Sequence, residues 1–297
     1  MTDYSPKYKS GFVAVIGKPN VGKSTFMNRM LGEKLSIVSP KPQTTRHQIK
    51  GILSGEDHQI VFLDTPGFLE PRYELQQKMM DYIKISLKDA DLLVFITDAH
   101  RFPTDYDLQM LELIAKTPVP AIAILNKIDL VVPEIAEKKL QLLKKESFLE
   151  LHSVSLLHDS TTTSLIQNIL KYIPYNPPYY NPDEVSDLPI KFFVQEIIRE
   201  KIFIAFRDEI PYCSTVVVEV YNDFPNKVDI AANIWLERKT QKIIIIGKGG
   251  EKIKAIRIAA EKEIHKILGK RVKLQLWVKV KSDWRNKKNA LKEFGYK

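Results

Sequence analysis

An eight-residue loop at 17–24, with the sequence GKPNVGKS, has the glycines, lysine and serine of a phosphate-binding loop. Its glycines let successive backbone N–H groups approach phosphate oxygens, and the helix expected after it adds a positive N-terminal end. Lys23 can reach the β- and γ-phosphates of a nucleotide, and the hydroxyl of Ser24 can ligate Mg²⁺. The residues expected to bind the nucleotide in this segment are Gly17, Pro19, Asn20, Val21, Gly22, Lys23, Ser24 and Thr25.

A second motif, Asp-Thr-Pro-Gly, follows the apolar run 60–63. The carboxylate of Asp64 can hold Mg²⁺ through water, and the N–H of Gly67 can contact a γ-phosphate. Ligands of parallel sheets bind at the carboxyl ends of the strands, so this motif falls where a nucleotide site is expected.

Between these two motifs, the polar and basic loop 41–51 contains two adjacent threonines. We expect the hydroxyl of Thr45, with Thr44 as the second choice, to ligate Mg²⁺ while the γ-phosphate is present. Loss of that phosphate would release the loop, which makes it a candidate switch. The expected Mg²⁺ ligands are therefore Ser24, Thr45 and Asp64.

A third motif, Asn-Lys-Ile-Asp at 126–129, follows the apolar run 121–125 and indicates which base is bound. Guanine presents two donors, N1–H and the 2-amino group, that the carboxylate of Asp129 can accept together. Adenine presents an acceptor at N1, which would leave that carboxylate unsatisfied. Asn126 can bond the base edge or tie loops together, and the stem of Lys127 can cover the ring. The expected ligand is therefore GTP, and its product GDP, rather than ATP.

The hydrolysis step has a less usual signature. Phe68 occupies the place where many small GTPases have a catalytic glutamine, and a phenyl ring cannot orient water by hydrogen bonding. We therefore expect intrinsic hydrolysis to be slow. The side-chain carbonyl of Asn20 is positioned in the loop to help hold a monovalent cation, K⁺, against developing phosphate charge. The residues expected to take part in catalysis are Lys23, Asn20, Thr45 and Gly67.

The first part of the chain alternates short apolar runs with longer helix-like segments, which predicts an α/β domain with a mostly parallel sheet. The expected strands lie at 12–17, 60–65, 92–99 and 121–127. Five prolines at 174–189 prevent a helix or a central strand there and indicate an extended linker. We place the domains at 1–175 and 190–297, with the proline-rich linker at 176–189.

The second part changes order, which predicts a smaller α+β domain. The expected elements are a helix at 190–206, strands at 214–221 and 228–237, a strand or apolar turn at 243–246, a basic helix near 250–268 and a strand at 272–280.

The charge is concentrated in this second part. Residues 1–175 have 21 basic and 20 acidic side chains, whereas residues 176–297 have 24 and 16, and 238–297 alone has 19 and 5. Such a stretch is either a solvated lysine-rich surface or the binding surface of a polyanion.

The sequence GKGG at 247–250 lies between four isoleucines and the basic helix, as a GxxG loop does in RNA-binding KH modules. Isoleucines 243–246 would form the groove for unpaired bases, and they are equally suited to the core. The tail 277–297 mixes aromatic and basic residues, which suits base stacking and phosphate contact. The expected RNA-binding residues are Gly247, Lys248, Gly249, Gly250, Lys252, Lys254, Trp284 and Arg285.

Taken together, these segments resemble the Era family of bacterial GTPases along essentially the whole chain. The similar stretches are GKPNVGKS, PQTTRH, DTPG, NKID, IREKIFIAFRDEIPY, LERKTQKIIIIGKGG and WVKVKSDWR. The resemblance implies a P-loop GTPase domain followed by a type II KH domain. It also implies binding to 16S ribosomal RNA near its 3′ end during assembly of the 30S subunit.

Two positions depart from the pattern of that family. The usual Ser-Ala pair of the last guanine loop has its match at 154–156, where we assign Ser155 and the backbone N–H of Leu156 to the nucleotide. Leu69 replaces the histidine usual shortly after DTPG, which further lowers the expected rate of unaided hydrolysis.

The composition favours the cytoplasm, and we expect the protein to be a monomer. The chain has 297 residues and a single cysteine, which suits a reducing compartment, and no apolar run approaches the ~18 residues needed to span a bilayer. Two other functions stay open: a signalling GTPase at the inner face of the membrane whose basic domain binds anionic lipid, and a nucleotide-sensing RNA binder without turnover.

Overall fold

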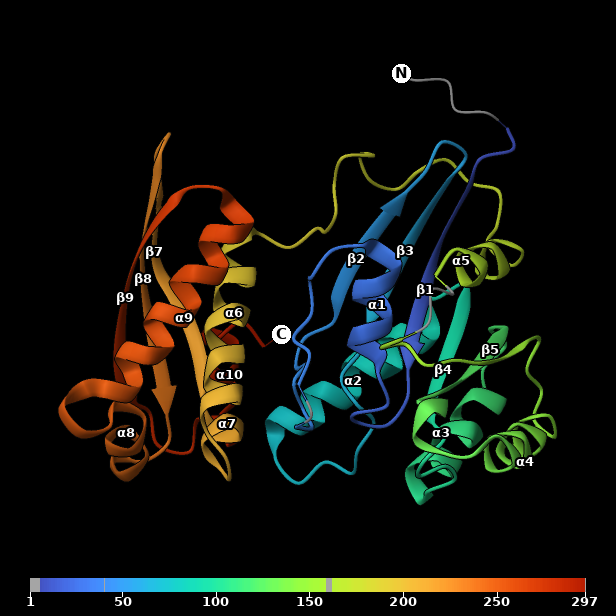
Figure 1. Ribbon diagram of the computed structural model, residues 1–297, viewed down its shortest axis with the longest axis horizontal. Coiled ribbons are helices and arrows are strands. Elements are labelled where there is room, and N and C mark those ends of the chain that lie inside the picture. Colours follow the sequence, from blue (N-terminus) through green and yellow to red (C-terminus); the bar gives the residue numbers. More distant parts are fainter. Residues whose placement is uncertain (1–5, 40, 159–161, 297) are drawn as a thin grey trace. The chain divides into compact units, whose positions relative to one another are not determined.

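The computed structural model describes residues 6–39, 41–158 and 162–296. In it the chain divides into two compact units. The first comprises the described residues up to Ser36, Thr45–Pro71 and Met79–Asp187. The second comprises Ile37–Thr44, Arg72–Lys78 and the described residues from Leu188 onward. Each unit is built around its own sheet (Figure 1).

The sheet of the first unit has six strands in the order β2-β3-β1-β4-β5-β6. All neighbouring pairs are parallel except β2 with β3. The strands are β1 (Lys9–Ile16), β2 (Ile49–Ser54), β3 (His58–Asp64), β4 (Leu92–Asp98), β5 (Ala121–Asn126) and β6 (Leu151–Ser153). The connecting helices are α1 (Lys23–Leu31), α2 (Glu74–Asp89), α3 (Asp105–Ala115), α4 (Pro133–Leu143) and α5 (Thr162–Leu170).

Near-continuous burial of the strands explains the parallel arrangement. Every residue of β4 and of β5 is buried, as expected when helices cover both faces of a sheet. The four predicted strands correspond to β1, β3, β4 and β5, so the α/β fold class is confirmed. Sequence reasoning missed β2, which begins within the polar loop 41–51, and β6, which has only three residues.

The proline-rich segment before the second unit is hydrogen-bonded to the first sheet. The N–H of Asn176 donates to the carbonyl of Tyr8 at 3.1 Å, and the N–H of Ile52 in β2 donates to the carbonyl of Val185 at 3.0 Å. Gln59 Oε1 accepts from the backbone N–H groups of Tyr179 and Tyr180 at 2.8 and 3.0 Å. The segment therefore runs along the sheet up to Asp187, and it contains a turn in which the N–H of Glu184 donates to the carbonyl of Asn181 at 3.0 Å.

The second unit has a three-stranded sheet in the order β7-β8-β9, with β7 antiparallel and β9 parallel to the central strand. Its strands are β7 (Thr215–Asp223), β8 (Lys227–Leu236) and β9 (Arg271–Val280). Its helices are α6 (Ile190–Ala205), α7 (Ile210–Cys213), α8 (Lys239–Ile246), α9 (Glu251–Leu268) and α10 (Lys288–Glu293). The order helix, two strands, GxxG turn, helix and strand confirms the expected KH arrangement.

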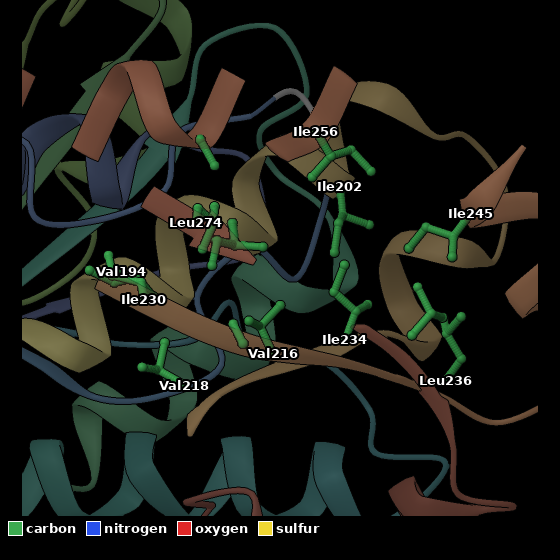
Figure 2. Packing of buried hydrophobic residues seen from close by; sticks show 14 of the residues in the cluster. Val194, Ile202, Val216, Val218, Ile230, Ile234, Leu236, Ile245, Ile256 and Leu274 are labelled. Carbon is green, nitrogen blue, oxygen red and sulfur yellow. The ribbon is translucent and has the colours of Figure 1, made fainter. Parts of the chain in front are cut away.

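One face of this sheet is covered by α6 and α9, which supply the apolar core of the unit (Figure 2). Val194, Ile198 and Ile202 of α6 lie in one cluster with Ile256, Ala260 and Ile264 of α9. The strands contribute alternate residues to that cluster, as the two-residue period of a strand requires. The opposite alternate residues therefore point away from the helices.

The expected strand or apolar turn at 243–246 is wrong, because these isoleucines end the helix α8. Four β-branched residues favour a strand locally, but the start and the end of the helix are both fixed. Gln241 Oε1 accepts from the backbone N–H groups of Glu237 and Arg238 at 3.1 and 3.0 Å. Gly247, with φ 74°, closes the last turn through its N–H to the carbonyl of Ile243 at 3.0 Å.

No helix within the described ranges is long and apolar enough to cross a bilayer.

Candidate nucleotide site and nucleic-acid interface

The phosphate-binding loop follows β1 and leads into α1. Gly17 (φ 148°) and Gly22 (φ 110°) have backbone conformations that side chains disfavour, and a Cβ on Gly17 would lie 2.2 Å from the carbonyl oxygen of Ile96. Lys23 Nζ donates to the carbonyls of Gly17 and Lys18 at 3.0 and 2.9 Å, which holds the ammonium over the loop. Burial lowers the pKa of Lys23 to about 8, although the nearby Asp64 carboxylate acts to raise it. A phosphate group at this position would supply the negative charge that this buried cation requires.

A buried ion pair, which the sequence did not predict, anchors the phosphate-binding loop to α3. Lys18 Nζ donates to Asp107 Oδ2 at 2.7 Å, and the Asp107 side chain is completely buried. Asp107 also accepts from the hydroxyls of Thr97 and Thr104 at 2.8 and 2.7 Å, so its oxygens are well satisfied. Thr104 and Asp107 form the capping box of α3, and that Thr-x-x-Asp pattern is the signal that was available in the sequence.

The three expected Mg²⁺ ligands lie together beside Lys23. Ser24 Oγ lies 3.0 Å from Thr45 Oγ1 and donates to Asp64 Oδ2 at 3.0 Å, and Thr45 Oγ1 donates to the same carboxylate oxygen at 3.3 Å. The hydroxyl in this cluster is that of Thr45 rather than Thr44. Among the described residues, Asp64 Oδ1 is buried without a hydrogen-bond partner. Two hydroxyls and a carboxylate are the hard oxygen donors that suit Mg²⁺, so the residues fit the ion.

The charge of Asp64 depends on that setting. Burial raises the pKa of its carboxyl above the ordinary value, against the opposing effects of Lys23 and of the hydroxyl hydrogen bonds. A divalent cation would favour the ionised carboxylate in the same way as Lys23 does, because it adds positive charge beside the buried group.

The Asp-Thr-Pro-Gly motif packs directly on the phosphate loop. A Cβ on Gly67 would lie 2.7 Å from Pro19, and the N–H of Phe68 donates to the carbonyl of Gly17 at 3.1 Å. The ring of Phe68 packs edge-on against Tyr106 at 6.4 Å between centroids, and Leu69 is buried. Neither side chain can orient water by hydrogen bonding, so slow unaided hydrolysis stays our prediction.

Asn126 ties the guanine loops together, which was one of its two expected roles. Its Nδ2 donates to the carbonyl of Val21 at 2.7 Å, and its Oδ1 accepts from the backbone N–H of Leu156 at 2.9 Å. The N–H of Leu156 therefore donates to Asn126 in this structure, and its expected contact with the base stays a prediction. Lys127, with φ 60°, donates from its ammonium to the carbonyl of Asn20 and so lies over the phosphate loop.

Ser155 has a specific role in the same site. Its hydroxyl donates to Asp129 Oδ1 at 2.5 Å, while Asp129 itself is exposed. The hydrogen bond orients the carboxylate that is expected to recognise guanine. Ser155 would thus support the base indirectly, through Asp129.

Replacement of this hydroxyl should weaken nucleotide binding moderately. For Ser155→Ala we expect GTP affinity to fall about 2- to 13-fold, the range for one hydrogen bond of about 0.5–1.5 kcal/mol. Fluorescence titration with a labelled guanine nucleotide measures this change. Ser153→Ala, at an exposed position of β6, is the matched control, and equal losses in both variants would contradict the assigned role.

The GxxG turn of the second unit lies between α8 and α9. Gly247, Gly249 and Gly250 all have positive φ, at 74°, 59° and 79°. A Cβ on Gly249 or Gly250 would meet no described atom within 4 Å, so the turn presents open backbone, as a phosphate clamp requires. The basic residues expected to meet phosphates, Lys248, Lys252 and Lys254, are exposed.

The isoleucines before this turn divide between the two expected roles. Ile245 is completely buried in the core, whereas Ile243 and Ile244 are 71% and 42% exposed. Exposed isoleucines beside open glycines form an apolar surface next to the turn, which suits unpaired bases.

Two residues of the tail were misassigned. Trp284 is wrong as a stacking residue, because its side chain is 0% exposed and its indole N–H donates to the carbonyl of Cys213 at 2.9 Å. Arg285 is half-buried, and it donates to both carboxylate oxygens of Glu237, at 3.0 and 2.6 Å. Burial alone would lower the pKa of Arg285, but the hydrogen bond to Glu237 raises it overall. This guanidinium is committed to a carboxylate and is not an open phosphate ligand.

Comparison with known protein families matches both units separately. A family model described as 50S ribosome-binding GTPase matches residues 12–127, and a KH domain model matches residues 209–285. A curated relative, GTPase Era of Staphylococcus haemolyticus (strain JCSC1435), is 41% identical over 292 residues, which cover 98% of either chain.

Two solved structures are similar over nearly the whole chain. One is Era in complex with MgGDPNP and nucleotides 1506–1542 of 16S ribosomal RNA, with a TM-score of 0.94 and 37% identity. The other is a variant of Era from Aquifex aeolicus bound to GDP and AlF4⁻, with a TM-score of 0.93 and 37% identity. In both cases the match covers 97% of this chain and 99% of the other.

Proposed function

Since this chain belongs to the Era family of GTPases, we propose that it is a GTP-controlled switch that binds 16S ribosomal RNA near its 3′ end and assists assembly of the 30S subunit. It binds GTP and GDP with Mg²⁺ and hydrolyses GTP. The proposal concerns what this cycle controls and where.

The observation that carries the proposal is the pairing of two sites on one chain. The first unit brings Ser24, Thr45 and Asp64 together beside the phosphate lysine. The second unit presents an open GxxG turn flanked by exposed isoleucines and lysines. A relative with both units binds a segment of 16S ribosomal RNA.

The residues of the first unit have distinct tasks in the cycle. Lys23 and the N–H of Gly67 would contact the β- and γ-phosphates, and Thr45 would share the Mg²⁺ site with Ser24 and Asp64. Because Thr45 belongs to the loop before β2, loss of the γ-phosphate would remove a reason for this loop to stay closed. A change in the conformation of this loop would transmit the nucleotide state to other parts of the chain.

We further propose a monomer that works in the cytoplasm. The runner-up is a GTPase at the inner face of the membrane whose basic unit binds anionic lipid. The net positive charge of residues 176–297 supports either polyanion, and the GxxG turn favours RNA.

Crosslinking of the full chain to RNA with GTP, with GDP and without nucleotide tests the proposal. We expect crosslinks within the last nucleotides of 16S ribosomal RNA, with a yield that depends on the nucleotide. The Gly249→Asp variant, which adds a side chain and a negative charge to the open turn, should lose the crosslinks and keep GTP binding. Recovery of anionic vesicles but no ribosomal RNA would replace this proposal by the runner-up.

The role proposed for K⁺ at Asn20 is separately testable. Asn20 is exposed in the phosphate loop with φ 65°. We expect GTP hydrolysis to be about 100-fold faster in K⁺ than in Na⁺, the lower end of what one electrostatic contact to developing charge supplies, and to lose this difference in Asn20→Ala. Equal rates in the two salts for the unmodified protein would contradict it.

A further inference from the structure

The sheet of the second unit has a second face, opposite α6 and α9, whose outer strand is basic. Along β9, Leu274 and Val278 are buried in the core, whereas Arg271, Lys273, Gln275, Trp277 and Lys279 are exposed. The strict alternation places these five side chains together on the open side of the sheet. We refer to them as the β9 face, and they span about 26 Å along the strand.

The cations of this face are available to an external anion. Within the part of the chain that the structure describes, Arg271, Lys273 and Lys279 have no ion pair, although the ammonium of Lys279 lies over the ring of Trp235 at 5.3 Å. Other cations of the unit do: Lys227 pairs with Asp229 at 3.0 Å, and Lys270 pairs with Asp223 at 2.6 Å. The carboxylates of Asp229 and Asp223 are therefore paired with these lysines, whereas Glu219 accepts from the amide of Asn233 at 2.6 Å. The cations of β9 keep their positive charge.

An exposed tryptophan lies among these cations. Trp277 is 49% exposed, whereas Trp284, seven residues on, is completely buried. In the sheet, Trp277 is opposite Asn233 of β8, and Gln275 is opposite the small residue Ala231. Trp235 of β8 lies on the same face, and the ammonium of Lys279 lies over its ring at 5.3 Å from the centroid. The surface therefore has one exposed ring, that of Trp277, a second ring beside it and cations along the strand. Aromatic rings on an open sheet stack unpaired bases in RNA-binding domains, with basic side chains holding the phosphates.

A hollow continues this surface at the beginning of β9. Its volume is about 390 Å³, and it is lined by Lys227, Asp229, Glu261, Arg271, Val272 and Lys273. Both of its carboxylates already have basic partners, because Glu261 accepts from Arg257 at 2.7 Å and Asp229 pairs with Lys227. Arg271 and Lys273 are the cations of the hollow that these carboxylates do not pair with.

We propose that the β9 face is a second RNA-binding surface, separate from the GxxG turn, which holds ribosomal RNA that continues beyond the nucleotides in the turn. The proposal rests on the proposed RNA-binding function and extends it. A GxxG turn clamps about four nucleotides, so a longer bound segment needs a further surface. The occupant is RNA rather than lipid because the exposed ring of this face, Trp277, lies among cations on a strand and not on a broad apolar surface. Membrane surfaces instead bind broad apolar faces of helices.

The test compares a long and a short RNA on the full chain loaded with a GTP analogue. The long probe is the segment 1506–1542 of 16S ribosomal RNA, and the short probe is an oligonucleotide of about four residues taken from its single-stranded part, which the turn alone accommodates. For Arg271→Glu/Lys273→Glu we expect affinity for the long probe to fall about tenfold or more. The slope of log affinity against log salt should flatten by one to two units, about one for each phosphate contact. Affinity for the short probe should stay within twofold.

Trp277 is tested in the same assay. Trp277→Ala should weaken the long probe about fivefold or more, the lower end for one stacked base, and Trp277→Tyr should restore most of that loss. Intact binding of the short probe and an unchanged unfolding temperature exclude misfolding, since the side chain is exposed. Lys266→Glu, an exposed site on α9, is the control for a charge change on the helical face.

The possible outcomes are distinct. Unchanged affinity of the long probe in the double variant, or an equal loss in Lys266→Glu, overturns the β9 face as an RNA surface. Stronger binding of the unmodified protein to anionic vesicles than to the long probe, lost in the double variant, overturns the choice of RNA. Failure of the unmodified protein to bind either RNA would instead overturn the proposed function itself.

Discussion

Asp129→Asn is expected to weaken GTP binding about 100- to 10,000-fold, because it replaces two hydrogen bonds to a charged acceptor, of about 1.5–3 kcal/mol each, by one to a neutral oxygen and places an N–H against the 2-amino group. Asp129 is exposed at the end of the loop after β5, and Ser155 holds one of its oxygens. The carboxylate is thus oriented toward solvent, where the N1–H and 2-amino donors of guanine can reach it. An asparagine has only one acceptor in its place and directs an N–H at the amino group.

The same variant should gain affinity for xanthosine triphosphate. Xanthine has an oxygen where guanine has its amino group, so the side-chain amide introduced by the substitution can donate to that oxygen and accept from N1–H. Competition titrations with GTP, ATP and xanthosine triphosphate measure the change in preference. Because Asp129 is exposed, the unfolding temperature should not change.

Glu134→Gln is the matched control for this experiment, since it removes one exposed carboxylate in the first turn of α4. It should leave all three affinities unchanged. Retention of GTP binding within threefold in Asp129→Asn, or a comparable loss in Glu134→Gln, would show that base selection lies elsewhere.

Trp284→Ala should have the largest effect on stability, a loss of about 3–5 kcal/mol in the free energy of unfolding of the second unit. The indole is fully buried, stacks on Tyr296 at 6.0 Å between centroids and meets Phe294 edge-on at 5.4 Å. The substitution leaves a cavity among these rings and removes the donor to the Cys213 carbonyl. Denaturant unfolding followed by circular dichroism measures the loss.

Trp277→Ala is the control for this prediction, because that ring is half-exposed and its removal should change stability by less than about 0.5 kcal/mol. GTP affinity should be unaffected in both variants, since the nucleotide site lies in the other unit. Equal stability of the two variants would contradict the assignment of Trp284 to the core. Comparison of the two variants thus distinguishes a tryptophan that stabilises the core from one that is proposed to bind RNA.

The nucleotide site could be predicted in detail because its chemistry depends on backbone geometry encoded in short motifs. Glycines at 17 and 22 are needed where φ is positive, and a lysine and a serine directly after them are fixed at the start of α1. The strands before each motif are continuous apolar runs, which is typical of buried parallel strands. Because the carboxyl ends of parallel strands lie at the same edge of the sheet, the motifs that follow them come together there. The pattern alone therefore indicated Ser24, Thr45 and Asp64 as neighbours, and the structure brings them within 3.3 Å.

Tertiary structure decided what local pattern could not. The sequence of four isoleucines reads as a strand, and only the cap at Gln241 and the burial of Ile245 make it the end of α8. Lys18 and Asp107 are far apart in sequence, and nothing but the packing of α3 behind the phosphate loop pairs them.

The tail shows the same limit most clearly. Composition places two tryptophans and several cations within 277–285, and either ring could face water. The alternation of side chains along β9 exposes Trp277. After the strand ends, the ring of Trp284 packs against the rings of Phe294 and Tyr296. Residue type and spacing determined that this protein has a guanine-nucleotide site and a basic KH unit. Which side chains of that unit are free to meet RNA was decided by burial and ion pairing, which depend on contacts between distant segments.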